Sequence, residues 1–229
     1  MNQALQQGFT TVRQRMSEAA SKAGRDPGEL RLVAVSKRHP ASAVSALAAL
    51  GQRDFGENYI DEALAKQAEA DPQHMLCWHF IGALQSNKTR QAAEHFDWVQ
   101  TVDRLKIARR LSEQRPDALA PLNILLQVNV SEEASKAGCS RDQVQALAEA
   151  CADLPRLRLR GLMAIPAALD DHAAQRQQIR PLFALWQQLR QQGHELDTLS
   201  VGMTDDLEAA VAEGSTMLRV GTALFGPRP

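Results

Sequence analysis

The amino-acid sequence predicts an α/β protein, namely a single TIM-type (β/α)8 barrel with an added N-terminal helix. Two observations carry this prediction. Short apolar or β-branched runs alternate with longer helical patterns along the 229 residues, and eight such runs can be counted. No linker rich in Pro, Gly or Ser and no low-complexity tract interrupts this alternation, so we expect residues 1–229 to form one domain.

The eight expected strands are short runs rich in β-branched and apolar residues. They span residues 31–36, 53–55, 77–81, 98–101, 123–130, 157–163, 198–201 and 217–220. The helical patterns between them span residues 41–50, 60–70, 105–114, 141–152, 173–192 and 206–212. Because the second and seventh strands are so short, a seven-stranded barrel or a doubly wound sheet is the alternative.

An amphipathic helix is expected within residues 3–22, ahead of the first strand. The sequence stops soon after the eighth strand, before the helix that would normally follow it. We therefore expect the N-terminal helix to cover the outside of the barrel where that last helix would pack. A second, β-rich domain is not expected.

The composition is that of an ordinary globular chain, with 44% hydrophobic residues, 23% charged residues and a formal net charge of −1. The basic residues are scattered, so nucleic acid is not an expected partner. The N-terminal stretch lacks the apolar core of a secretion signal, and no run of about 18 apolar residues follows, so we expect a cytoplasmic protein without a membrane partner. Cys77, Cys139 and Cys151 lack CxxC spacing and are expected to be free thiols.

Polar residues gather where the expected strands end. The carboxyl ends of the strands in a barrel converge on one face, so these residues are expected to surround a common site. They are Lys37, Glu57, Asn58, His79, Asp103, Asn129, Ser200, Arg219 and Gly221. The histidines show no metal-ligand spacing, so no metal site is expected, and His79 is interpreted as a core histidine with satisfied hydrogen bonds.

Lys37 ends the first strand. Side chains alternate along a strand, so Lys37 shares a face with Val33 and Val35. If this face lines the barrel, the lysine stands at the barrel mouth, where its amine can act as a nucleophile. The alternative is a solvated lysine whose aliphatic stem covers apolar surface.

Residues 199–226 place two glycine-bearing strand ends around a short helix. In barrels of this type, the loops after strands seven and eight often supply backbone N–H donors to a phosphate. Gly202 and Gly221 would let the backbone approach a ligand, and hydroxyls are offered by Ser200, Thr204 and Thr222. The alternative is that Thr204 caps the following helix and that the glycines only form turns.

Six motifs, in this order along nearly the whole chain, resemble those of the YggS/PROSC family of pyridoxal phosphate (PLP)-binding proteins, also called PLP homeostasis proteins. The motifs are AGRDPGELRLVAVSK, FGENYIDEALAK, WHFIGALQSNK, LLQVNV with the following SKAG, GLMAIP, and LSVGMTDDLEAAVAEGSTMLRVGTALFG. The family resembles the barrel domain of alanine racemase without that enzyme's second domain. The pair Arg38–His39 replaces the more usual Thr–Lys pair after the lysine, and Thr204 stands where many relatives have serine.

The resemblance implies that PLP is the cofactor and that it forms a covalent aldimine with Lys37. The other residues that it assigns to PLP are Asn58 near the ring, Arg219 at the pyridine nitrogen, and Ser200, Thr204, Gly221 and Thr222 at the phosphate. Lys88 and Lys136 are candidates for a secondary PLP contact, and mobile surface lysines are the simpler interpretation of both.

An arginine at the pyridine nitrogen restricts the chemistry, because a guanidinium donates a hydrogen bond without giving up its proton and leaves the ring a weaker electron sink. Racemisation also needs a second acid/base group, and Tyr59, the only tyrosine, is expected to begin a helix instead.

The resemblance therefore implies a monomeric, non-catalytic protein of PLP homeostasis. It would buffer, protect or deliver PLP to apo forms of PLP-dependent enzymes and thereby affect amino-acid and keto-acid metabolism. A PLP-dependent racemase is the alternative, and a Schiff-base aldolase acting on a phosphorylated substrate is a more distant one.

Overall fold

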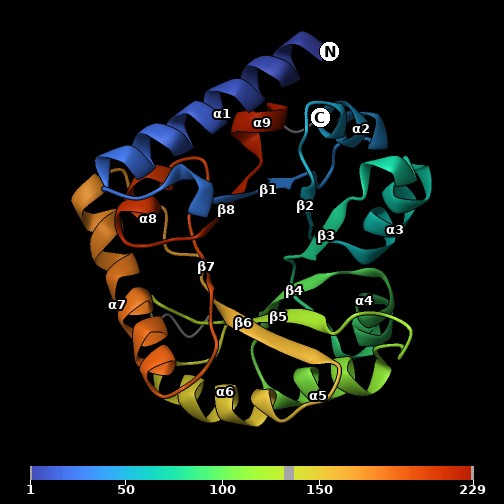
Figure 1. Ribbon diagram of the computed structural model, residues 1–229, viewed down its shortest axis with the longest axis vertical. Coiled ribbons are helices and arrows are strands. Elements are labelled where there is room, and N and C mark those ends of the chain that lie inside the picture. The colour runs from blue at the N-terminus through green and yellow to red at the C-terminus, as the bar shows by residue number, and fades with distance from the viewer. Residues whose placement is uncertain (1, 132–136, 228–229) are drawn as a thin grey trace.

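The computed structural model describes residues 2–131 and 137–227, and it confirms the predicted barrel. Eight parallel strands pair in chain order, and β1 pairs with β8 to close the barrel (Figure 1). The strands are β1 (Arg31–Val35), β2 (Asp54–Glu57), β3 (Cys77–Phe80), β4 (Trp98–Val102), β5 (Leu122–Gln127), β6 (Leu157–Met163), β7 (Thr198–Ser200) and β8 (Met217–Val220). The seven-stranded and doubly wound alternatives are therefore wrong.

Helices surround the barrel (Figure 1). They are α1 (Asn2–Lys22), α2 (Ala41–Ala49), α3 (Ile60–Glu69), α4 (Thr89–His95), α5 (Leu105–Gln114), α6 (Val144–Ala152), α7 (His172–Gln191), α8 (Leu207–Ala212) and α9 (Thr222–Phe225). Sequence patterning missed α4 and α9, which have only seven and four residues. Within the described ranges, none of the helices combines the length and apolarity needed to cross a bilayer.

The N-terminal helix α1 covers the outside of the barrel next to the last strand, as the sequence predicted. α1 packs against α8, α9 and α2 (Figure 1). Gly8 brings α1 so close to α9 that a Cβ atom there would lie 2.8 Å from the carbonyl oxygens of Ala223 and Leu224. Farther along α1, Arg15 donates to the Glu208 carboxylate at 2.8 Å and to the Thr204 carbonyl oxygen at 2.9 Å. α1 therefore also holds the loop that follows β7.

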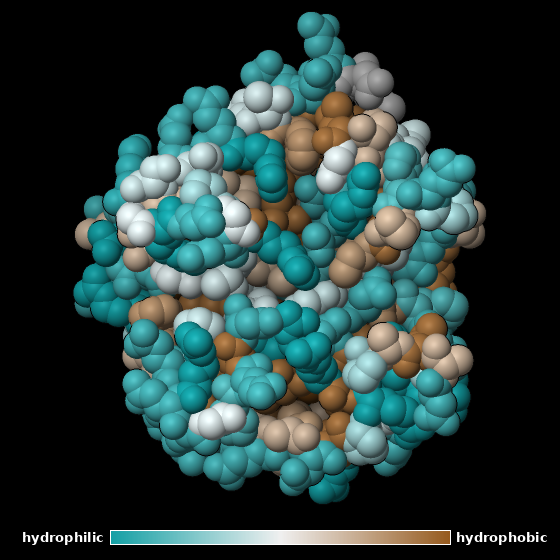
Figure 2. Space-filling model, viewed as in Figure 1, coloured by the Kyte–Doolittle hydropathy of each residue, from teal (hydrophilic) through white to brown (hydrophobic). Residues whose placement is uncertain are grey.

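The barrel separates two apolar layers. Leu32 and Ala34 belong to the large outer core between strands and helices, whereas Val33 belongs to a small cluster inside the barrel with Trp98, Leu125, Met163 and Met217. This arrangement confirms the alternation expected for β1. Polar side chains cover most of the molecular face seen in Figure 2, and hydrophobic side chains show mainly in its hollows. The three cysteines are free thiols, as expected.

Candidate functional site

A pocket of about 200 Å³ lies among the loops that follow the carboxyl ends of the strands. Its walls come from segments far apart in sequence, after β1, β2, β3, β6, β7 and β8. It brings together six of the seven residues predicted to bind PLP, namely Lys37, Asn58, Thr204, Arg219, Gly221 and Thr222. Of the nine polar strand-end residues expected around a common site, the pocket lining therefore contains Lys37, Asn58, Arg219 and Gly221.

Lys37 lies half-buried in the pocket wall, two residues beyond Val35, which lines the same pocket. The chain turns immediately after it. Arg38 adopts a left-handed conformation with φ of 65°, and the His39 N–H donates to the Ser36 carbonyl oxygen. The turn carries α2 away from the barrel and leaves the lysine at its mouth.

A buried ionic network holds this turn. Lys66 of α3 is 4% exposed, and its Nζ donates to the Ser36 carbonyl oxygen at 2.7 Å, to Glu57 Oε1 at 2.6 Å and to Glu62 Oε1 at 2.7 Å. Glu62 Oε1 also accepts from the Arg38 N–H. Burial raises the pKa of Glu57, against the hydrogen bonds from Lys66 and Ser36 that favour its charged form. Glu57 thus lies behind the Lys37 turn and not in the pocket lining.

Arg219 of β8 is 4% exposed and lines the pocket, and the nearby Asp206 carboxylate favours its charged form. Its Nη1 donates to Ser200 Oγ at 2.7 Å and its Nη2 to the Ala164 carbonyl oxygen at 2.9 Å. None of the ion pairs found among residues 2–131 and 137–227 includes it. Burial lowers the pKa of Arg219 to about 10, so the guanidinium stays charged at neutral pH.

Ser200 is the predicted residue that the structure does not place in the pocket lining. Its side chain is fully buried, accepting from Arg219 and donating to Gln100 Oε1 at 2.7 Å. The single hydroxyl proton is thus already used inside the barrel. The structure corrects the sequence interpretation here, because Ser200 lies behind Arg219 and does not face the pocket with the other predicted phosphate residues.

The loop after β7 and the start of α9 form the opposite wall. Thr204 is half-buried, and its Oγ1 accepts from the Ala223 N–H at 3.4 Å, so it joins the two segments. The residue that caps α8 is Asp206, not Thr204. Gly202 has φ of 102°, and a Cβ there would lie 2.5 Å from that of Ala210, so this glycine shapes the loop. The hydroxyls of Thr204 and Thr222 and the backbone of Gly221 line the pocket, with Asp205 also in its wall.

Asn58 follows β2 and gives the pocket an unsatisfied acceptor. Its Oδ1 is buried and has no hydrogen-bond partner among the described residues. Leaving such an acceptor unpaired costs about 1–3 kcal/mol. A ligand that carries a hydroxyl donor would recover that free energy.

The remaining candidates from the sequence lie elsewhere. His79 is fully buried and bonded to Asp54 and Gln100, which confirms its interpretation as a core histidine. Tyr59 precedes α3 and is 52% exposed outside the pocket lining. Lys88 pairs with Asp61 at 3.2 Å on the surface. Lys136 lies outside the described residues.

Two other polar strand ends also fall outside the pocket lining. Asp103 pairs with the neighbouring Arg104 at 2.7 Å. Asn129 donates its backbone N–H to the Cys139 carbonyl oxygen and accepts on Oδ1 from the Ser131 hydroxyl at 3.2 Å. Both residues therefore stabilise loops on their own side of the barrel.

Comparison with known proteins agrees with this geometry. The family model of the alanine racemase N-terminal domain matches residues 10–229. The pyridoxal phosphate homeostasis protein of Pseudomonas aeruginosa is 59% identical over 223 residues, which cover 97% of this chain and 95% of the relative. The protein of that name from Escherichia coli K12 is 52% identical and covers 95% of this chain and 94% of its own length.

Solved structures show the same barrel. PipY of Synechococcus elongatus PCC7942, whose structure has PLP bound, is 39% identical with a TM-score of 0.80 over 92% of this chain and 100% of its own. A protein from Bifidobacterium adolescentis is 31% identical with a TM-score of 0.92, covering 98% of this chain and 95% of its own. Alanine racemase from Corynebacterium glutamicum, at 16% identity and a TM-score of 0.70, shares the fold over 95% of this chain and 61% of its own.

The buried Lys66–Glu57 pair yields a stability prediction. Lys66→Met should destabilise the protein by about 3–5 kcal/mol, because it leaves the Glu57 carboxylate buried without its cation. The double variant Glu57→Gln with Lys66→Met should recover much of this loss. Urea denaturation followed by circular dichroism measures both.

Lys88→Met is the matched control, since it removes an ammonium whose partner Asp61 is exposed. It should change the free energy of unfolding by less than about 1 kcal/mol. If the double variant were as unstable as Lys66→Met alone, the loss would not come from an unpaired Glu57.

Proposed function

We propose, from the premise that this chain belongs to the family of the pyridoxal phosphate homeostasis proteins, that its pocket binds PLP through Lys37 and that it buffers, protects or delivers this cofactor. The chain covers almost the whole length of its curated relatives, and the related PipY carries PLP in its structure. The observation that carries the proposal is the pocket itself. It places a lysine, a buried guanidinium and two threonine hydroxyls around one cavity.

The pocket fits the functional groups of PLP. When bound, PLP supplies an aldehyde and an electron-withdrawing pyridine ring. The unsatisfied Asn58 Oδ1 matches the ring hydroxyl, which is a donor. Arg219 donates through Nη1 and Nη2 to the neutral oxygens of Ser200 and Ala164, and its other N–H groups match the lone pair of a ring nitrogen.

Lys37 is the residue that we assign to covalent attachment. Its neutral amine attacks the aldehyde carbon, a C=N bond replaces the C=O bond, and the aldehyde oxygen leaves as water. No oxidant or other co-reactant is needed, and hydrolysis reverses the reaction. The turn at Arg38, held by Lys66 and Glu62, keeps the lysine in the pocket wall.

Thr204, Gly221 and Thr222 are assigned to the phosphate. The two hydroxyls and the backbone at the start of α9 offer donors to phosphate oxygens. Asp205 in the same wall disfavours an anion held by charge alone, so neutral donors have to carry the binding. Ser200 is removed from this set because its hydroxyl is bonded inside the barrel.

We infer a non-catalytic role from the weak electron sink and from the position of Tyr59, although His39 and Asp205 also line the pocket. Lys37 can serve one face of a bound amino acid, and proton transfer on the other face requires a second acid/base group. Tyr59 is the only tyrosine of the sequence, and it lies exposed outside the lining. Arg219 also leaves the ring nitrogen without its own proton, which weakens the ring as an electron sink.

The partners that we propose follow from this role. Apo forms of PLP-dependent enzymes are the recipients, and through them the protein affects amino-acid and keto-acid metabolism. We propose that the protein acts as a monomer in the cytoplasm, a role with which a pocket lined by residues of one chain is compatible.

The first prediction concerns the attachment point. Borohydride reduction of the PLP-loaded protein should leave a pyridoxyl group on Lys37, and Lys37→Ala should abolish both this adduct and the visible absorption. Mass spectrometry of peptides locates the adduct. Lys88→Ala is the control and should label like the wild type, and pyridoxal without phosphate should label far less. An adduct found solely on another lysine would refute the assignment.

The second prediction concerns delivery. Loaded protein should restore the activity of a purified apo-enzyme in the presence of a phosphatase that destroys free PLP, because the phosphate is shielded in the pocket. Lys37→Ala mixed with the same amount of PLP is the control and should restore much less. If free PLP performed as well as the loaded protein under these conditions, delivery would be excluded.

The third prediction concerns catalysis. The PLP-loaded protein should not exchange the α-proton of alanine or other amino acids with solvent deuterium at an enzymatic rate, because Arg219 in the pocket wall leaves the pyridine ring a weak electron sink. Nuclear magnetic resonance measures the exchange. Turnover at about 1 per second or faster that Lys37→Ala abolishes would establish an enzyme instead.

A further inference from the structure

A continuous chain of hydrogen bonds runs through the barrel interior from the pocket to Asp54 at the start of β2. Arg219 Nη1 donates to Ser200 Oγ at 2.7 Å, and Ser200 donates to Gln100 Oε1 at 2.7 Å. Gln100 Nε2 lies 2.9 Å from His79 Nδ1, and His79 Nε2 lies 2.9 Å from Asp54 Oδ1. Five strands contribute to this chain, namely β8, β7, β4, β3 and β2.

The chain has one direction, because a guanidinium can only donate. Ser200 accepts from Arg219, so its own proton goes to Gln100 Oε1. Gln100 then presents its amide N–H to His79 Nδ1, and the remaining proton of His79 sits on Nε2 and goes to Asp54. Every donor therefore points away from Arg219 and every acceptor faces back toward it.

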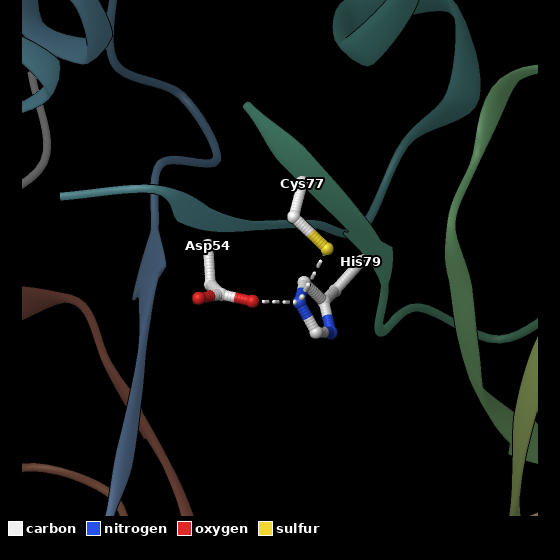
Figure 3. Close-up of side chains that lie close together, drawn as sticks. All are labelled: Asp54, Cys77 and His79. Atoms are coloured by element: carbon white, nitrogen blue, oxygen red, sulfur yellow. Dashed lines mark hydrogen bonds and ion pairs between the residues drawn. The ribbon is translucent and has the colours of Figure 1, made fainter. Parts of the chain in front are cut away.

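The far end of the chain also explains a cluster that resembles a metal site. Ligand atoms of Asp54, Cys77 and His79 lie within 4.8 Å of one another (Figure 3). In the direction set by Arg219, however, His79 Nε2 carries a proton and cannot ligate an ion. Burial also raises the pKa of the Cys77 thiol, so the sulfur stays protonated. The cluster is satisfied as the end of a hydrogen-bond chain.

Such a chain is unusual inside a barrel whose core is normally filled by branched apolar side chains. His79, Gln100 and Ser200 are each 0% exposed, and each has a partner on both sides. His79 also stacks on Trp98 at 5.3 Å, and Gln100 contacts Met217 Sδ at 3.1 Å, so apolar neighbours hold the chain in place. Buried networks that are fully satisfied make a core rigid and fix one geometry.

The aligned dipoles of this chain favour a positive charge at Arg219 and a negative charge at Asp54. Burial lowers the pKa of His79, so this link stays neutral at pH 7 and adds no competing charge. Burial opposes the charge of Asp54, but the hydrogen bond from His79 and the nearby Arg31 bring the pKa of Asp54 below its ordinary value. The carboxylate at the end of the chain is therefore ionised.

We propose that Gln100 is a positioning residue for Arg219, which acts through Ser200 and is itself held by His79 and Asp54, so that the guanidinium faces the ring nitrogen of the ligand. This inference rests on the proposed binding of PLP. It assigns the specificity for a pyridine ring to residues that line the barrel interior and not the pocket.

The test compares PLP with its carbocyclic analogue, in which C–H replaces the ring nitrogen, so that only one contact differs. Gln100→Met keeps the volume of the side chain but gives Ser200 no oxygen acceptor. Gln100→Glu keeps that acceptor. Leu125→Met is the control, a change of similar size inside the barrel at a residue outside the chain.

The wild type should bind PLP more tightly than the analogue, which confirms the premise that Arg219 meets the ring nitrogen. Gln100→Met should weaken PLP binding by about tenfold, as expected for one buried hydrogen bond to a charged group, while binding of the analogue changes by less than about twofold. Gln100→Glu should restore most of the preference, and Leu125→Met should retain all of it. Isothermal titration calorimetry measures these affinities, and thermal unfolding reports stability separately.

If Gln100→Met fails to fold, Ser200→Ala replaces it, because it removes the acceptor of Arg219 and leaves only a small cavity. Equal losses for PLP and the analogue, or an unchanged preference, would overturn the positioning role and leave Gln100 as a structural residue. A wild type that binds neither compound would refute the proposed function, and one that binds both equally would refute the contact between Arg219 and the ring nitrogen. These failures are therefore distinguishable.

Discussion

The burial of one positive charge, the Arg219 guanidinium, governs the design of the pocket. A carboxylate partner would stabilise this charge strongly, but it would also occupy the donors that face the cavity. The protein instead supplies neutral oxygens from Ser200 and Ala164, with Asp206 as a nearby negative charge and Asp54 at the far end of the hydrogen-bond chain. The guanidinium remains charged, since its pKa falls only to about 10, and it keeps N–H groups for a ligand.

The other walls are fixed by ionic contacts that do not reach into the cavity. Lys66 and its two carboxylates hold the turn after Lys37, and Arg15 of α1 holds the loop of Thr204 through Glu208 and a backbone oxygen. The N-terminal helix therefore does more than cover apolar surface. With both loops held from behind, little conformational entropy has to be lost when a ligand binds, and more of the contact free energy appears as affinity.

The sequence predicted the barrel, because strand alternation and helical periodicity are local signals that this fold obeys closely. It also predicted six of the thirteen residues that line the pocket, since strand ends meet at one face, whereas lining residues such as Ile81, Ile165 and Met203 carry no polar signal in the sequence. The sequence grouped Ser200 with Thr204, because both offer a hydroxyl close to the end of β7. The structure separates them, since the Ser200 hydroxyl is bonded to Gln100 and Arg219 inside the barrel and only Thr204 lines the pocket. The ion pair between Glu62 and Lys66 can be predicted from sequence, because residues four apart face each other on a helix. The pair between Lys66 and Glu57 cannot, because it depends on how α3 packs on the barrel.

The polar barrel core and the buried guanidinium of Arg219 both bear on whether the pocket holds a ligand or transforms it. A catalyst must bind a transition state better than its ligand, which requires groups that gain contacts as the reaction proceeds. Here the donors are held before binding: Ser200 and Gln100 have partners on both sides, Arg219 is fixed through Ser200 and the Ala164 carbonyl oxygen, and Thr204 is bonded to α9. In the proposed complex, such donors would stabilise the cofactor in its ground state, and the proposed Schiff base with Lys37, which water can reverse, would allow its release. A pocket with donors held in this way would therefore suit the proposed role of holding PLP.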